Sequence, residues 1–234
     1  MENDVASIYK DGTYAAKNKA MGDDNAAWKA GNVLRIMKDA GLHPKTILEV
    51  GCGAGGILVE LKKQLPEDVM FSGLEPMPEA YAAASKRCDD RLSFKQATID
   101  TPPDKQFDVV LCLDVFEHIE DYFKFLRGLR SFGGKFIFHI PLDMNTQMVF
   151  RASPIRRVRE SVGHLHYFSK DTALASLEYC GYKILRHCYT RSWESKYSTF
   201  AFKLASLPRR LGYAIAPDFT ARVLGGLPLL VLAE

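Results

Sequence analysis

A run of small residues supplies the first chemistry that the sequence could perform. Residues 49–56 read Glu-Val-Gly-Cys-Gly-Ala-Gly-Gly and directly follow a short apolar segment. Glycines let the backbone approach a ligand closely, and a helix that begins after them offers unpaired N–H groups. Gly51, Gly53 and Gly56 also satisfy the G-x-G-x-x-G spacing of dinucleotide-binding loops. The loop therefore predicts a nucleotide-type cofactor, with a purely structural turn as the alternative.

Two acidic residues narrow the choice of cofactor. Glu75 lies at a suitable distance downstream to bind ribose hydroxyls, either of a dinucleotide or of S-adenosylmethionine. Glu49 precedes Gly51 by two residues, where an acid disfavours a pyrophosphate but suits a ligand that carries an ammonium and a sulfonium. The chain after the fourth expected strand also begins no second mononucleotide-binding half. These features favour S-adenosylmethionine over NAD(P).

Three histidines are candidates for general bases: His118, His164 and His166. An unperturbed histidine has a pKa of about 6.5, which suits proton transfer near neutral pH. His118 follows Asp114 by four residues, so both could lie on one side of a helix start; alternatively, Glu117 and His118 cap and orient that helix. His164 and His166 alternate in an extended segment and are expected to point to the same side. We expect one of them to act in catalysis or to contact the substrate, and the alternative is hydrogen bonding within the loop.

The sequence offers no obvious metal site. No further ligand is spaced near the histidine pair, so we expect no metal. The five cysteines include no C-x-x-C pair, which argues against a zinc knuckle or a disulfide framework and favours the cytoplasm.

An arginine cluster indicates the chemistry of the substrate. Arg151, Arg156, Arg157 and Arg159 lie in the connection after the fifth expected strand. Because guanidinium groups bind carboxylate and phosphate groups through paired hydrogen bonds, an anionic substrate is a reasonable expectation for the first three. A solvated helical face is the alternative.

The global composition limits the partners. The net charge of +3 is too small to indicate nucleic-acid binding. No apolar run reaches the roughly 18 residues of a membrane-spanning helix, and residues 1–14 contain no apolar core of a secretory signal. We expect a cytoplasmic protein that binds neither nucleic acid nor membranes, and the oligomeric state stays open.

Helical and strand patterns alternate along the chain, which predicts an α/β fold with a mostly parallel sheet and helices on both faces. Strands are expected at 46–50, 69–74, 92–97, 107–113, 135–140, 182–189 and 227–233. Helices are expected at 25–40, 57–64, 78–88, 115–129, from 153, at 169–179, 198–207 and 219–224.

Five segments, taken in order, resemble class I S-adenosylmethionine-dependent methyltransferases of the small-molecule type, which includes ubiquinone-biosynthesis O-methyltransferases. These segments are ILEVGCGAGG, GLEP, FDVVLCLDVFEHI, GGKFIFHIP and GHLHYFS. The resemblance covers roughly residues 45–190. It implies a Rossmann-like seven-stranded sheet of order 3-2-1-4-5-7-6 with the seventh strand antiparallel.

The resemblance also implies roles for the matching residues. Those expected to lie against the methionine moiety are Glu49, Gly51, Cys52 and Gly53. Glu75 would bind both ribose hydroxyls, and the residues expected near the adenine are Pro76, Met77, Thr98 and Ile99. An aspartate is commoner at the position of Thr98. The residues expected beside the sulfonium are Leu113 and Asp114, and Tyr14 would contact the cofactor from an N-terminal lid.

We therefore expect one methyltransferase domain over residues 1–234. Its parts would be an N-terminal helical cap (1–40), a cofactor-binding core (41–140), an acceptor-side connection (141–168) and an insertion before the last strand (190–224). The expected activity is methyl transfer to an O or N atom of a small molecule, for which the arginine cluster favours an anionic group. The alternatives are a non-catalytic S-adenosylmethionine-binding module and an NAD(P)-dependent oxidoreductase.

Overall fold

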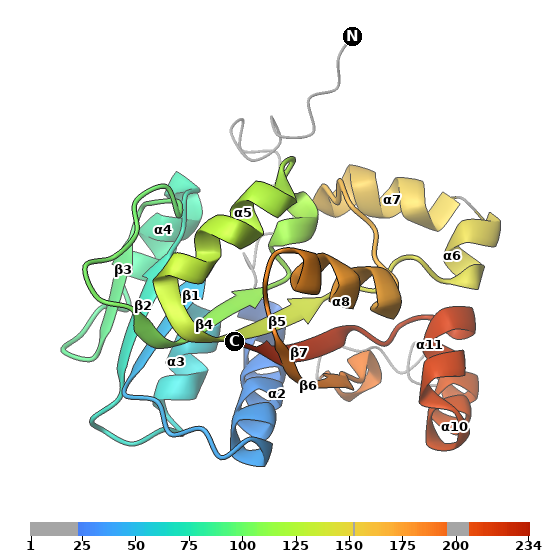
Figure 1. Ribbon diagram of the computed structural model, residues 1–234, viewed down its shortest axis with the longest axis horizontal. Coiled ribbons are helices and arrows are strands. Elements are labelled where there is room, and N and C mark those ends of the chain that lie inside the picture. Colours follow the sequence, from blue (N-terminus) through green and yellow to red (C-terminus); the bar gives the residue numbers. More distant parts are fainter. Residues whose placement is uncertain (1–22, 152, 196–205) are drawn as a thin grey trace, which may run out of the picture.

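The computed structural model describes residues 23–151, 153–195 and 206–234, and a seven-stranded sheet organises them (Figure 1). The strand order is β3-β2-β1-β4-β5-β7-β6, which confirms the predicted Rossmann-like α/β fold. The strands are β1 (Thr46–Val50), β2 (Met70–Leu74), β3 (Leu92–Lys95), β4 (Phe107–Leu113), β5 (Gly133–Ile140), β6 (Ile184–Tyr189) and β7 (Leu229–Ala233).

Helices alternate with these strands. In the N-terminal half they are the short 3-10 helix η2 (Asp23–Asn25) and the helices α2 (Ala26–Asp39), α3 (Gly56–Lys62) and α4 (Pro78–Ser85). Between β4 and β6 they are η3 (Phe116–His118), α5 (Tyr122–Leu129), η4 (Arg130–Phe132), α6 (Thr146–Arg151), α7 (Ser153–Val162) and α8 (Lys170–Tyr179). Before β7 they are η5 (Ser192–Glu194), α10 (Leu207–Ile215) and α11 (Pro217–Leu224).

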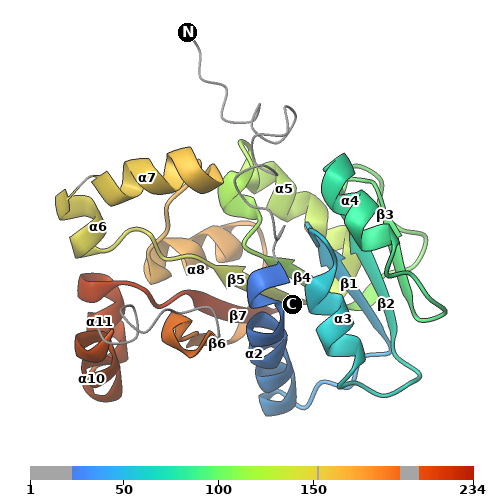
Figure 2. The same cartoon turned by 180° about the vertical axis from the view of Figure 1, so that it is seen from behind.

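The sheet separates two hydrophobic cores. In β4, Val110 and Cys112 pack in the core beneath α5 and α8, whereas Val109, Leu111 and Leu113 pack in the core beneath α2 and α3. Figure 1 shows α5 and α8 in front of the sheet, and Figure 2, from behind, brings α2 and α3 forward. Both faces of the central strands are therefore buried, as their nearly continuous apolar sequence requires.

The strand directions define the edge at which a ligand site can form. Strands β1 to β5 are parallel, whereas β7 pairs antiparallel with both β5 and β6. The carboxyl ends of β1, β2, β4 and β5 therefore meet at one edge. In open α/β sheets ligands bind in the crevice outside these carboxyl ends.

The predicted elements match the observed ones except in the third quarter and near the C-terminus. The single helix expected at 115–129 is wrong: η3 ends at His118 and α5 begins only at Tyr122. The cause is local, because the Asp121 carboxylate accepts a hydrogen bond from the Lys124 N–H and so caps a new helix. Helices α6 and α10 were not predicted. Most of the helix expected at 198–207 lies outside the described residues.

Within the described ranges, no helix is both long and apolar enough to cross a membrane.

Candidate cofactor and acceptor site

The loop between β1 and α3 folds back onto the neighbouring strand. The N–H groups of Gly51 and Cys52 both donate to the carbonyl oxygen of Leu74, at 2.8 and 3.1 Å. Gly51 has a φ of +69°, and a Cβ there would lie 2.7 Å from a methyl group of Val115. A side chain at Gly51 would therefore be both strained and obstructed, so the glycine is required by the backbone path. The backbone at the carboxyl end of β1 is therefore not covered by side chains.

Glu75 joins this loop to the end of β2. One carboxylate oxygen accepts the Gly53 N–H and the other accepts the Met77 N–H, each at 2.8 Å. The side chain is only 5% exposed. Burial raises the pKa of Glu75, while the two backbone donors act in the opposite direction. The carboxylate is thus fixed beside the glycine loop.

Glu49 and Cys52 lie beside the same loop and are both buried. Burial, followed by the charges of Glu49 and Glu75, raises the pKa of the Cys52 thiol far above its ordinary range. Cys52 is therefore a protonated, unreactive thiol at neutral pH.

Asp114, directly after β4, has an unusual backbone and two close side-chain partners, Lys29 and His139. Its φ is +58°, and no other non-glycine residue in the described ranges has a positive φ. Its carboxylate contacts Nζ of Lys29 at 2.7 Å and Nδ1 of His139 at 2.5 Å. The other nitrogen of His139 lies 2.9 Å from the hydroxyl of Thr190. Burial alone would raise the pKa of Asp114, but His139 and Lys29 hold it well below its usual value.

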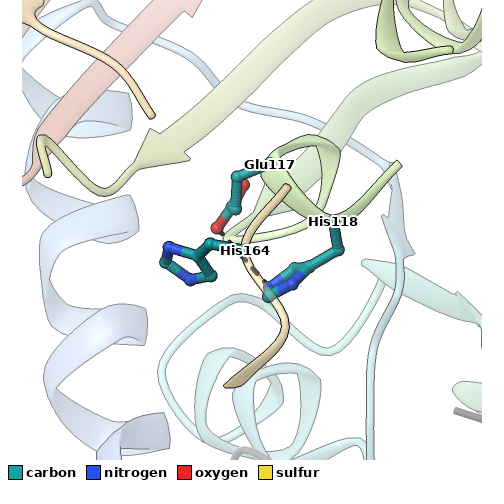
Figure 3. Close-up of side chains that lie close together, drawn as sticks. All are labelled: Glu117, His118 and His164. Carbon is teal, nitrogen blue, oxygen red and sulfur yellow. Dashed lines mark ion pairs between the residues drawn. The ribbon is translucent and has the colours of Figure 1, made fainter. Parts of the chain in front are cut away.

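A second cluster forms where η3 meets the segment before α8. Figure 3 shows Glu117, His118 and His164 turned toward one another. Nε2 of His118 lies 3.8 Å from a carboxylate oxygen of Glu117, and the two imidazole rings are 4.7 Å apart between centroids. Nδ1 of His164 lies 2.6 Å from the Asp143 carboxylate, and Nδ1 of His118 lies 3.2 Å from the carbonyl oxygen of Gly163. Burial and the neighbouring His164 lower the pKa of His118 to about 4, so this ring is neutral at pH 7.

The three candidate histidines are thus placed differently. Nε2 of His166 faces the carbonyl oxygens of Ile119 and Glu120 at 2.9 and 3.1 Å, so it donates a structural hydrogen bond. His118 and His164 form one cluster. The expectation that His118 and Asp114 share a helical face is wrong, because Asp114 precedes η3 and binds Lys29 and His139 instead.

The residues expected around the adenine are placed at the edge of β2 and β3. Met77 is buried and Pro76 exposed. Thr98 is exposed and forms a hydrogen bond with Asp100, whereas Ile99 packs partly against the hydrophobic core. The side chain of Leu113 is buried in the core beneath α2 and α3, at the end of β4.

The arginines lie on the outer helices. Arg156 and Arg157 are exposed on α7, and Arg151 on α6 donates to the side chain of Gln147 at 3.3 Å. Tyr14 lies outside the described residues.

A groove of about 480 Å³ opens beside α6 and α11, and one of its lining residues, Met144, directly follows Asp143. It is lined by Met144, Asn145, Thr146, Val149, Phe150, Ser169, Asp171 and Arg222. Arg222 pairs with Asp171 at 2.9 Å, so its charge is already balanced within the groove. The rest of the wall is largely apolar. Met144 in this wall directly follows Asp143, the hydrogen-bond partner of His164, in the chain.

The sheet order defines an α/β protein of the Rossmann-like type. The glycine loop and Glu75 lie together at the edge formed by the carboxyl ends of its parallel strands. The chain belongs to the methyltransferase domain family, whose model matches residues 26–187. This confirms the family that the sequence motifs predicted.

Relatives of known activity match part of the chain. An ubiquinone biosynthesis O-methyltransferase of Rickettsia conorii is 36% identical over 84 residues, which are 36% of this chain and 29% of that protein. An ajmaline N-methyltransferase of Rauvolfia serpentina is 34% identical over 93 residues, 37% of this chain and 31% of that protein. The matched region thus spans about a third of each relative's length.

A solved structure shows the same fold over nearly the whole chain. The N-methyltransferase NodS of Bradyrhizobium japonicum, in complex with S-adenosyl-L-homocysteine, has a TM-score of 0.61 at 16% identity. The similarity covers 94% of this chain and 97% of that one.

The sequence could not reveal every member of the site. Lys29, His139 and Asp143 were not singled out, because each lies far along the chain from the residue that it contacts. One available signal was the position of His139 near the end of a buried strand, where a polar side chain needs a partner.

Proposed function

We propose that the protein is an S-adenosylmethionine-dependent methyltransferase acting on an O or N atom of a small, anionic molecule. The observation that carries this proposal is the Glu75 carboxylate, which is buried and fixed by Gly53 and Met77 beside the bare peptides of the glycine loop. Such an acid suits the two ribose hydroxyls of an adenosine, because each hydroxyl can donate to a carboxylate oxygen.

The residues of the site fit this cofactor. Gly51, Gly53 and Gly55 all have positive φ, so the backbone there curves as a chain with side chains would not. Glu49 lies at the loop's start and adds a negative charge that suits an ammonium or a sulfonium. When bound, S-adenosylmethionine supplies an activated methyl group on its sulfonium. Leu113 and Asp114 would then lie near that sulfonium, at the end of β4.

The chain's own residues mainly orient the reactants. Holding two reactants in a reactive geometry contributes on the order of 7–11 kcal/mol in favourable cases. Asp114 is fixed for this task by Lys29 and His139. The acceptor atom would meet the methyl group beside His118 and His164, where a proton can be taken or an oxygen polarised.

The acceptor-side connection provides the remaining contacts. The groove beside α6 would take an apolar part of the acceptor, since Met144, Val149 and Phe150 line it and Met144 follows Asp143 in the chain. Arg151, Arg156 and Arg157 would attract its anionic group.

A titration tests the cofactor first. S-adenosylmethionine and S-adenosylhomocysteine should each raise the melting temperature, because a ligand that binds the native state stabilises it, whereas NAD should not. Stabilisation by NAD alone would overturn the proposal. Methyl transfer is then measured against a panel of small carboxylated and phosphorylated phenols and amines. Binding of S-adenosylmethionine without any product would favour a non-catalytic binding module.

A further inference from the structure

The most unusual polar group in the described ranges is the carboxylate of Glu117. The residue is fully buried, and neither carboxylate oxygen accepts a hydrogen bond from another described residue. A buried polar group without a partner is costly, and a buried carboxylate more so. One added proton would still leave the other carboxylate oxygen without a partner. The buried carboxylate therefore indicates a bound cation, which can accept lone pairs from Glu117 and from neighbouring side chains.

The two histidines next to this carboxylate are both held through Nδ1, which leaves Nε2 as the lone-pair atom of each ring. The carbonyl oxygen of Gly163 can only accept, so Nδ1 of His118 carries the hydrogen and Nε2 carries the lone pair. The Asp143 carboxylate sets the same tautomer in His164. A histidine that binds a metal usually donates its other N–H to a carboxylate or a backbone carbonyl, and both versions occur here.

The distances are also close to those that a metal ion needs. One ligand atom each from Glu117, His118 and His164 lies within 4.8 Å of the other two, and the Glu117–His118 pair is at 3.8 Å. Metal–ligand bonds of about 2.0–2.2 Å place neighbouring ligand atoms about 3–3.5 Å apart. Small side-chain rotations would close the difference.

We propose that Glu117, His118 and His164 bind a divalent transition-metal ion, with Asp143 and the Gly163 carbonyl orienting the two imidazoles (Figure 3). Two imidazoles and one carboxylate suit Zn²⁺, Mn²⁺, Fe²⁺ or Co²⁺, whereas Mg²⁺ and Ca²⁺ prefer oxygen ligands. This assignment replaces the sequence-based expectation of no metal, which rested on local spacing. His164 lies far from Glu117 along the chain.

The metal would also explain how an acceptor hydroxyl is activated. Three protein ligands leave at least one coordination position open, and a bound hydroxyl loses its proton more easily on a divalent ion. This consequence rests on the proposed function, whereas the metal site itself stands on the geometry of the three side chains.

Cobalt binding tests the site without cofactor or acceptor. The full chain is dialysed against a chelator and titrated with Co²⁺, whose visible absorption reports the geometry of its ligands. We expect one saturable site with the spectrum of a four- or five-coordinate ion, and Zn²⁺ should displace the cobalt. Glu117→Gln and His164→Asn should each weaken binding at least about 100-fold. Asp143→Asn should weaken it by about 10–100-fold, the effect usual for a residue that orients a ligand.

His187→Asn is the matched control, because His187 is exposed on β6 and should not affect cobalt binding. Circular dichroism and melting temperature verify that each variant is folded. Unchanged cobalt affinity in a folded Glu117→Gln variant would overturn the proposal, and so would a loss of binding in His187→Asn. Cofactor binding is measured separately, so a chain that binds Co²⁺ but not S-adenosylmethionine contradicts the proposed function alone.

Discussion

Lys29 of α2 places its Nζ 2.7 Å from the carboxylate of Asp114, the residue that follows β4. Burial lowers the pKa of Lys29, but Asp114 more than compensates, so that this pKa lies above its ordinary value and the pair is ionised. The N-terminal helix is thereby tied to the edge of the sheet where the site lies. Asp114 depends on this contact because its positive φ is itself unfavourable.

Replacing Lys29 should therefore weaken the fold. Lys29→Met leaves a partly buried carboxylate with His139 as its remaining hydrogen-bond partner. Breaking a buried pair costs about 3–5 kcal/mol, and since Asp114 is 29% exposed we expect about 2 kcal/mol. Urea denaturation measures this difference. Lys38→Met, at an exposed position of the same helix, serves as control, and equal effects of the two variants would contradict the assigned role.

Glu75 should control cofactor affinity. Glu75→Ala removes both the acceptor of the ribose hydroxyls and the anchor of the Gly53 and Met77 N–H groups. Hydrogen bonds to a charged group contribute about 1.5–3 kcal/mol each, so affinity for S-adenosylhomocysteine should fall at least about tenfold. Calorimetric titration measures the change. Glu79→Ala, exposed in the first turn of α4, should retain the affinity of the unmodified protein.

The glycine loop should not tolerate a methyl group at Gly51. Gly51→Ala imposes a positive φ on alanine and places Cβ 2.7 Å from a Val115 methyl group. Strain and overpacking each cost about 1–3 kcal/mol, and we expect a loss of about 2 kcal/mol or more. Gly134→Ala has no atom within 4 Å of the added Cβ and should change stability by less than about 0.5 kcal/mol. A comparable loss in both variants would show that the close approach at Gly51 has no effect.

The link between β1 and β4 should give a defined pH dependence. Asp108 accepts the N–H groups of Lys45 and Thr46 at 2.7 and 2.9 Å, and these bonds lower its pKa despite the opposing effect of partial burial. A carboxyl whose folded pKa is depressed stabilises the protein above its unfolded pKa, about 3.9, and this contribution disappears as the pH falls through the folded pKa.

Asp108→Asn should therefore lose about 1 kcal/mol at pH 7, a modest value because the residue is exposed. The difference from the unmodified protein should stay constant down to about pH 5 and shrink below pH 4. Denaturation at several pH values measures it, with Asp104→Asn as control. A difference that grows on acidification would refute the assigned cause.

The arginines of α7 should affect the acceptor rather than the cofactor. Replacing Arg156 and Arg157 with alanine removes two exposed guanidinium groups, which the proposed function assigns to the acceptor. We expect KM for an anionic acceptor to rise several-fold, with little change in binding of S-adenosylhomocysteine. Steady-state kinetics and calorimetry separate the two. An unchanged KM in an active enzyme would mean that these arginines do not bind the acceptor and only form a solvent-exposed face of α7.

Local sequence signals predicted the sheet well. Strand β4 has the predicted bounds because its apolar run from Val109 to Leu113 is buried between two helical layers. The glycines and Glu75 could be singled out because they match a recognisable motif, although Glu75 accepts the Gly53 N–H from 22 positions along the chain. Val115 was predicted as the start of a helix, but Asp121 caps a later one and leaves only a 3-10 turn between.

The polar contacts of the site were harder to predict. Lys29 is one of two lysines on the amphipathic helix α2, and only the fold brings it to Asp114. The cluster around Glu117 likewise combines distant segments of the chain, and His118 and Gly163 lie 45 positions apart. Spacing rules recognise ligands from one turn or loop, and they miss sites assembled from two distant segments.

Strand β7 lies between β5 and β6 and runs against β5, so that Leu229 pairs with Ile140 and Ala233 with Phe136. Its last residues therefore point to the edge of the sheet opposite the glycine loop. An affinity tag or a fluorescent protein fused after Glu234 would start on that far side. Such a fusion would leave the reactive edge accessible, which makes this end the suitable one for immobilising the protein in the binding experiments above.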